Sequence, residues 1–282
     1  MKILESYAKC LKILGGYMIT SKENQIVKYI KALSQKKYRD LNQEYIVEGI
    51  KMIKEAIENQ ENISKLIICD ELAENILKND PNMKNLISNR EFNNITEYVS
   101  KSVFEYISDT MSPQGILAII KMKETNQTEY SELIFALDDL QDPGNLGTII
   151  RTLESSGYKD LILSNNTAEP YNPKVVRSTM GAIFRLDLHR NIDLKQELTN
   201  LKSKGYKVVV TSLETENYYY DLNFNEKLII VIGNESKGVS KDIQELADIK
   251  VKIPMLGKTE SLNAAVATSI IAYEGVRQKI SK

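Results

Sequence analysis

The chain has 282 residues, of which 27% are charged and 42% are hydrophobic, and its formal net charge is −1. This balance is typical of a globular protein and excludes one that coats nucleic acid over its whole surface, although a local basic patch is allowed. At about 150 residues per domain, the length predicts two domains.

Few residues could support metal or nucleophilic chemistry. Cys10 and Cys69 are the only cysteines, which is too few for a disulfide framework and fits a reducing cytoplasm. His189 is the only histidine, so Ser-His-Asp hydrolysis would have to use it and a multi-histidine metal site is excluded. No apolar run approaches the length of a membrane-spanning helix. We therefore expect a cytoplasmic protein that binds neither metal nor membrane.

The N-terminal segment, Met1 to Tyr17, differs from the rest of the chain. It is short, contains Gly15-Gly16 and ends just before a second methionine, Met18. Two interpretations stay open. The segment is either a loosely attached extension, with Met18 as the true start, or an additional helix packed on the body.

The residues from Met18 to Lys121 alternate between helical and strand-like patterns. Thr20 and Glu23 have the spacing of a capping box before apolar residues at helical spacing. Strands are then expected at 44–47, 66–69 and 115–120, and helices near 50–57, 72–77 and 102–107. This order predicts a small α/β domain, and the polar residues 122–131 after it predict a linker.

The second half of the chain is more regular. Strands rich in Val and Ile are expected at 133–137, 161–163, 208–211, 228–232 and 251–253. Helices are expected between and after them at 146–155, 174–184, 194–204, 241–247 and 262–280. This alternation predicts a mostly parallel sheet covered by helices on both faces.

Three loops at the carboxyl ends of these strands are unusual, and ligands bind at that edge of a parallel sheet. In the first loop, 139–151, a Pro143-Gly144-Asn145 turn opens a helix whose free N–H groups suit a phosphate. The second, 233–238, has a glycine at each end, which would let a ligand approach the backbone. The third, 253–263, leads into a helix with Ser261 as the expected cap.

Each loop taken alone has a plain structural interpretation as a turn or a capped helix. Neither a P-loop nor the G-x-G-x-x-G dinucleotide motif is present. Taken together and in this order, the loops resemble the motifs of the SpoU/TrmH family of RNA 2'-O-ribose methyltransferases, within the SPOUT superfamily. The matching residues are Asn145, Gly147 and Arg151; Gly233, Asn234, Glu235 and Gly238; and Ile253, Pro254, Met255, Ser261, Leu262, Asn263 and Ala267.

The match extends closely over 133–278, including a fourth element at 177–182 in which Thr179 replaces the usual serine. Residues 18–121 look, more loosely, like the family's L30e-like substrate-binding domain. The resemblance implies an α/β SPOUT domain at 132–282, with a parallel sheet and a C-terminal trefoil knot. It also implies S-adenosylmethionine as cofactor, a homodimer, and RNA as substrate.

Ribosomal RNA is the expected substrate, and transfer RNA is the alternative. The rival of a different class is a catalytically silent RNA-binding module. The family motifs place the cofactor at Thr211, Leu213, Gly233, Asn234, Gly238, Ile253, Met255 and Leu262. They assign catalysis to Arg151, Asn145, Glu235, Ser261 and Asn263.

Methyl transfer to a ribose 2'-hydroxyl requires that the hydroxyl is held in line and loses its proton. Arg151 is either the base or a cation that stabilises the developing alkoxide, and a guanidinium is nearly always charged. Asn145, Ser261 and Asn263 are expected to orient the ribose and its phosphate. Glu235 is expected to share this task and to pair with Arg151.

The segment 22–39 contains six basic residues and one acidic residue, a local charge of +5, with Tyr29 and Tyr38 interleaved. Basic residues with aromatic side chains between them suit unpaired RNA. We predict that Lys36, Lys37 and Arg39 contact RNA. The alternative is a solvated helix face.

Overall fold

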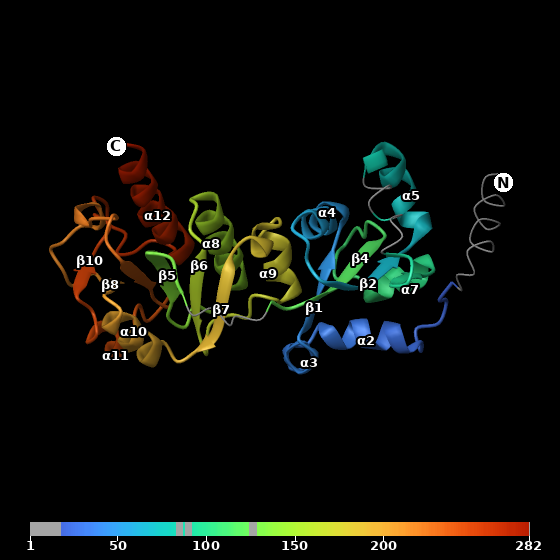
Figure 1. The fold of residues 1–282 in the computed structure, drawn as a ribbon, viewed down its shortest axis with the longest axis horizontal. Coiled ribbons are helices and arrows are strands. Elements are labelled where there is room, and N and C mark those ends of the chain that lie inside the picture. The colour runs from blue at the N-terminus through green and yellow to red at the C-terminus, as the bar shows by residue number, and fades with distance from the viewer. Residues whose placement is uncertain (1–17, 83–86, 88–91, 124–128, 282) are drawn as a thin grey trace. The chain divides into compact units, whose positions relative to one another are not determined.

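The computed structural model describes residues 18–82, 87, 92–123 and 129–281, so the predictions for 1–17 lie outside the described residues (Figure 1). The chain divides into two compact units: Met1–Lys123 with Tyr171–Pro173, and Glu124–Pro170 with Lys174–Lys282. The first division, between Lys123 and Glu124, falls within the expected linker 122–131.

A four-stranded sheet with the order β1-β4-β2-β3 forms the centre of the N-terminal unit. β1 (Glu44–Glu48) and β2 (Ile63–Ile68) pair antiparallel with β4 (Ile116–Lys121), and β3 (Thr96–Tyr98) pairs parallel with β2. The sequence did not predict β3, because it has three residues and none of them is buried.

Helices cover both faces of this sheet (Figure 1). α2 (Gln25–Leu33) and α7 (Lys101–Ile107) bury residues such as Val27 and Phe104 against one face. α4 (Ile50–Glu58) buries Ile53 on the other face. The remaining helices of this unit whose bounds are described are α3 (Lys36–Asn42) and α5 (Asp70–Asn79).

The prediction that Thr20 and Glu23 form a capping box at the start of α2 is wrong. Asn24 caps the helix, because its Oδ1 accepts a hydrogen bond from the Ile26 N–H at 2.9 Å. Glu23 lies in the preceding turn, where its N–H donates to Ser21 Oγ at 3.1 Å. Asparagine is as good a cap as serine or threonine, so the spacing of Thr20 and Glu23 did not decide where the helix begins.

Six strands form the sheet of the C-terminal unit, in the order β10-β8-β9-β5-β6-β7, and every adjacent pair is parallel. The prediction of a parallel sheet is therefore confirmed. The strands are β5 (Leu133–Leu137), β6 (Asp160–Ser164), β7 (Asp187–Ile192), β8 (Lys207–Thr211), β9 (Leu228–Ile232) and β10 (Ile249–Val251).

Two strands of this sheet differ from expectation. β7 was not predicted, because an edge strand can carry polar residues such as Arg190 and Asn191. β10 ends at Val251 instead of Ile253, because its last partner on β8 is Thr211, the final residue of that strand.

Helices cover both faces of this sheet as well (Figure 1). α10 (Leu194–Ser203) and α11 (Lys241–Gln244) pack on one face, and α8 (Pro143–Ser155) and α12 (Ala264–Ile280) pack together on the other. The helix expected at 174–184 is divided into α9 (Pro173–Ser178) and the 3-10 turn η2 (Ala182–Phe184). Met180 and Gly181 separate the two, with φ angles of 53° and 96° that no α-helix accommodates. The trefoil knot stays a prediction.

Candidate active site

The three loops that the sequence singled out follow β5, β9 and β10, and all begin at one edge of the sheet. β8 lies between β10 and β9 in the sheet. β8 ends at Thr211, β10 at Val251 and β9 at Ile232. β5 is the next strand along, and its loop leads into α8. All three motif loops therefore start at the carboxyl edge, where parallel sheets bind ligands.

The loop from Gly233 to Gly238 is closed by its own backbone. The Asn234 N–H donates to the Gly238 carbonyl at 3.0 Å, and the Gly238 N–H donates to the Asn234 carbonyl at 2.9 Å. A Cβ at Gly233 would lie 2.1 Å from the Gly238 carbonyl carbon and 2.2 Å from the Val239 nitrogen. Glycine is thus needed at 233 because the loop folds back on itself, which the expectation of a ligand's close approach did not foresee.

The side chain of Asn234 shapes the same loop. Its Oδ1 accepts from the N–H groups of Ser236 and Lys237 at 2.9 and 3.1 Å, and its Nδ2 donates to the Asp139 carbonyl at 2.8 Å. The amide therefore ties the second motif loop to the loop that follows β5.

Glu235 faces the start of α8. Its carboxylate accepts hydrogen bonds from Asn145 Nδ2 at 3.0 Å and from the N–H groups of Asp142 and Gln141 at 3.1 and 3.2 Å. Burial raises the pKa of the Glu235 carboxyl, but these hydrogen bonds outweigh burial and hold the pKa below its usual value. Glu235 is therefore an anion at neutral pH, fixed at the positive end of a helix.

Asn145 and Asn263 complete this polar cluster. Asn263 Nδ2 donates to Asn145 Oδ1 at 2.8 Å. Asn263 also caps α12, because its Oδ1 accepts from the Ala265 N–H at 2.9 Å. The helix begins after Asn263, so the expected cap at Ser261 is wrong. The structure thus joins Glu235, Asn145 and Asn263 from the three motif loops.

Arg151 and Ser261 lie outside the cluster. Arg151 is exposed on α8, six residues after Asn145 and so about 9 Å further along the helix axis. Within the described ranges of one chain its guanidinium forms no hydrogen bond or ion pair, so the expected pairing with Glu235 is not made within the chain, where Asn145 Nδ2 donates to that carboxylate instead. Ser261 is exposed in the loop before α12.

Apolar side chains are exposed in the segments that follow the strand ends. Leu213 after β8 is 62% exposed, Leu256 after β10 is fully exposed and Leu262 is 36% exposed. Ile253 and Met255, which follow β10 in the chain, are half-buried. Exposed apolar side chains in loops at this edge of the sheet are typical of a ligand site or an interface.

The residues expected to contact RNA separate into two kinds. Lys36 and Lys37 are exposed at the start of α3. Arg39 is only 2% exposed, and its Nη1 donates to the carbonyls of Leu33 and Ser34 at 2.9 and 2.8 Å. Arg39 therefore holds the end of α2, and its assignment as an RNA contact is wrong.

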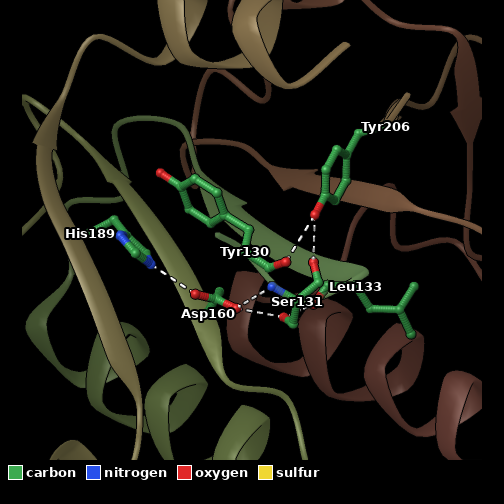
Figure 2. Close-up of polar contacts among 6 residues, drawn as sticks. All are labelled: Tyr130, Ser131, Leu133, Asp160, His189 and Tyr206. Carbon is green, nitrogen blue, oxygen red and sulfur yellow. Dashed lines mark hydrogen bonds and ion pairs between the residues drawn. The ribbon is translucent and has the colours of Figure 1, made fainter. Parts of the chain in front are cut away.

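A second polar cluster lies in the sheet at the opposite ends of the strands (Figure 2). His189 Nε2 lies 2.9 Å from Asp160 Oδ1, and both residues are buried. Asp160 Oδ2 accepts from the Ser131 N–H at 2.8 Å and from its hydroxyl at 2.6 Å. Tyr206 donates to the Tyr130 and Ser131 carbonyls at 3.1 Å each.

This cluster cannot act as a Ser-His-Asp triad, because Asp160 stands between Ser131 and His189 and the histidine is 3% exposed. In the described ranges, no group of three or more His, Cys, Asp or Glu residues could hold a metal ion. The same ranges contain no helix long and apolar enough to cross a membrane.

Residues 132–273 match the SpoU rRNA Methylase family, and residues 24–118 match the MRM3-like substrate binding domain. This chain belongs to the SpoU rRNA methylase family. A SpoU-family protein is an RNA methyltransferase that uses S-adenosylmethionine, so the predicted reaction class and cofactor are confirmed.

Relatives and solved structures agree with this assignment. The chain is 31% identical to the 23S rRNA 2'-O-methyltransferase RlmP of Bacillus subtilis, over 90% of this chain and 97% of that protein. An rRNA methyltransferase from Sinorhizobium meliloti, solved with AdoMet, has a TM-score of 0.80 at 28% identity, covering 93% of this chain and 98% of that one. The SpoU methyltransferase AviRb from Streptomyces viridochromogenes, in complex with AdoMet, has a TM-score of 0.80 at 27% identity, covering 92% and 100%.

Proposed function

We propose that this SpoU-family protein methylates a ribose 2'-hydroxyl of ribosomal RNA. The joining of Glu235, Asn145 and Asn263 is the observation that carries the proposal, because it assembles three separate motifs into one polar site. The similarity to a 23S rRNA enzyme over almost its whole length supports ribosomal RNA over transfer RNA.

The test has two parts. Purified protein is incubated with methyl-labelled S-adenosylmethionine and either ribosomal or transfer RNA, and 2'-O-methyl sites are mapped in cells with and without the gene. Label in ribosomal RNA and a single lost site there support the proposal. Label confined to transfer RNA would establish the alternative, and no label with either RNA would favour the silent RNA-binding module.

The loops at the carboxyl edge fit S-adenosylmethionine. Leu213, Leu256 and Leu262 offer apolar surface for its adenine and carbon chain, and backbone groups of 233–238 lie at the same edge. When bound, the sulfonium of this cofactor supplies an electrophilic methyl group. We expect a chelator to leave the activity unchanged, because direct displacement at a sulfonium needs no metal.

The polar cluster orients the acceptor nucleotide. Glu235 is held as an anion by three donors, and it fixes the Asn145 amide, which in turn meets Asn263. Side chains positioned by such hydrogen bonds lose little freedom when they bind a ribose or phosphate. Ser261 is exposed in the loop that leads to Asn263 and could donate its hydroxyl to the same phosphate.

Arg151 acts as a cation in this proposal. Its exposed guanidinium has no partner among the described residues, so its charge is free to meet a phosphate or a developing alkoxide. The proton of the 2'-hydroxyl then passes to a phosphate oxygen or to water. An arginine that stayed bound to Glu235 could not serve in this way.

We also propose a cytoplasmic homodimer in which Arg151 of one subunit serves the site of the other. Arg151 lies outside the cluster of its own chain, which supports a shared site. To test this, subunits with Arg151→Ala are mixed with subunits that carry Leu213→Glu, a change that we expect to abolish cofactor binding and that calorimetry checks beforehand. Partial return of activity after verified subunit exchange supports sharing, whereas a mixture as inactive as its parents overturns it.

A further inference from the structure

An exposed tyrosine in the N-terminal unit is flanked by two lysines that lie more than 70 residues before it in the chain. Tyr106 belongs to α7, and its neighbours Val103 and Phe104 are buried in the core, whereas Tyr106 is 42% exposed. Lys22 Nζ lies 4.8 Å and Lys31 Nζ 5.1 Å from the centre of its ring. Lys22, Lys31 and Tyr106 together form what we call the Tyr106 patch.

The two lysines of the patch differ from nearby lysines in their ion pairing. Lys28 pairs with Glu23 at 2.6 Å, and Lys101 on α7 pairs with Glu71 at 3.6 Å. In the part of the chain that the structure describes, neither Lys22 nor Lys31 forms an ion pair with an acid. Two ammonium groups thus converge on one ring, where its π-electrons offset their mutual repulsion.

A nucleotide has groups that complement this arrangement. Its phosphate is an anion that two ammonium groups can neutralise together, and its base has a flat face that stacks on a tyrosine ring. Within the basic segment 22–39, Arg39 is buried and Lys28 is paired with Glu23, so these two cations are engaged elsewhere. Lys22 and Lys31, in contrast, face the Tyr106 ring. The patch thus offers a phosphate site and a stacking site in one place.

We propose that the Tyr106 patch binds one unpaired nucleotide of the RNA substrate. The phosphate draws the two flexible lysine side chains away from the ring, and the base stacks on the face of Tyr106 that they leave. This inference rests on the proposed function, because it names where the substrate of that reaction is held away from the reacting ribose. Lys36 and Lys37 at the start of α3 would contact further phosphates.

The experiment measures binding of a short fluorescent single-stranded RNA and of a blunt RNA duplex of the same length. Tyr106→Ala should weaken single-strand binding about tenfold or more, and Tyr106→Phe should bind within about twofold of the parent, because phenylalanine also stacks. Duplex binding should change little in either variant. Equal affinities for the Ala and Phe variants, or equal losses on both RNAs, would overturn the stacking.

The lysines are tested by salt dependence. Lys22→Gln with Lys31→Gln should reduce the log–log salt slope by about 1.4, or about 0.7 for each lost contact to single-stranded RNA. The matched control is Lys51→Gln with Lys54→Gln, which removes the same charge from α4 on the other face of the sheet. If both double variants change the slope equally, the patch is no phosphate site.

Two assays on the parent protein, cofactor binding and methyl transfer, distinguish a failure of this inference from a failure of the proposed function. A parent that binds no S-adenosylmethionine, by calorimetry, would overturn the proposed function whatever the patch does. A parent that transfers methyl groups, with patch variants that bind RNA as it does, would overturn only the inference. Thermal unfolding midpoints equal to that of the parent confirm that the variants fold.

Discussion

Asn263 donates a hydrogen bond to Asn145 across 2.8 Å, although 118 residues separate them in the chain. Each asparagine stands at the beginning of a helix, Asn145 in the first turn of α8 and Asn263 as the cap of α12. Their contact therefore fixes the starts of two packed helices relative to each other. Asn145 extends the contact to Glu235, so a change at one amide affects all three motif loops.

Replacing Asn145 by alanine should impair methyl transfer more than folding. The substitution removes the hydrogen bonds to Glu235 and Asn263, and a hydrogen bond to a charged group contributes about 1.5–3 kcal/mol. We expect the free energy of unfolding to fall by no more than this amount, and the methyl-transfer rate to fall about 10- to 100-fold because the acceptor ribose loses a positioned amide. Thr148→Ala, on the exposed side of the same helix, is the control and should keep the rate. Equal rates for both variants would contradict a role for the cluster.

Arg151→Ala should separate activity from stability. The guanidinium has no partner among the described residues, so the free energy of unfolding should change by less than about 0.5 kcal/mol. Loss of one positioned charge at a reacting oxygen should lower the methyl-transfer rate about 10²- to 10³-fold. Arg151→Lys should restore little, because lysine lacks the planar fork of donors. A variant with normal activity would remove Arg151 from the catalytic residues.

The two glycines of the 233–238 loop should respond differently to substitution. Gly233→Ala places a methyl group against the backbone at Gly238 and should cost about 1–3 kcal/mol or more of folding stability. Gly238 has open space around it and a φ of 68°, which asparagine tolerates, so Gly238→Asn should cost less than about 1 kcal/mol. Chemical denaturation of both variants measures the difference. A stable Gly233→Ala protein would show that the loop can open.

Lys36 and Arg39 should likewise behave as different kinds of residue. Arg39→Ala leaves the Leu33 and Ser34 carbonyls without their donor and should destabilise the protein by about 1–3 kcal/mol. Lys36→Ala with Lys37→Ala should leave stability unchanged and reduce RNA affinity. Thermal unfolding and RNA titration at several salt concentrations measure the two effects. If Arg39→Ala alters RNA affinity and leaves stability unchanged, Arg39 contacts RNA and does not stabilise the end of α2.

Because of Asp160, the free energy of unfolding should decrease as the solution is acidified. Burial raises the pKa of its carboxyl, but hydrogen bonds from His189 and Ser131 outweigh burial and lower the pKa in the folded protein. The stabilisation is therefore complete above the unfolded pKa of about 3.9 and is lost as the pH falls through the lower folded pKa. Asp160→Asn should cost about 2–3 kcal/mol at neutral pH.

The measurement for Asp160→Asn is the free energy of unfolding in denaturant, taken at a series of pH values. The stability gap between the parent and Asp160→Asn should narrow as the solution is acidified, because both then lack the carboxylate. The control variant is Ser203→Ala, on the exposed surface of α10. Its free energy of unfolding should differ from that of the parent by the same amount at every pH. A gap of constant size across the acid range would show that the carboxylate has no lowered pKa.

The patterns that predicted the C-terminal sheet were those of buried strands. Leu133–Leu137 and Leu228–Ile232 are apolar throughout, and the structure has both with the expected bounds. β7 escaped prediction because an edge strand needs apolar residues on one face only. The division of the 174–184 helix depends on the positive φ of Met180, which no local signal foretold.

In the site, motif spacing predicted which loops meet but not which atoms do. Glu235, Asn145 and Asn263 were expected at one site and lie there. The predicted partner of Glu235 was Arg151, because opposite charges were the only guide, whereas backbone N–H groups and an amide take that place. Arg39 was misassigned because its burial depends on how α3 folds back on α2. Tyr106 carried no signal, since its lysines come from a distant part of the chain.

The bonds from Ser131 to Asp160 bear on how the catalytic domain can be produced alone. A fragment that begins at Leu133, the first residue of β5, would lack both donors to Asp160 Oδ2 and both carbonyls that receive the Tyr206 hydroxyl. It would expose a buried carboxylate with one remaining neighbour, His189, among the residues drawn in Figure 2. A fragment that begins at Glu129 keeps all four bonds, so the smallest expressible domain starts before its first strand.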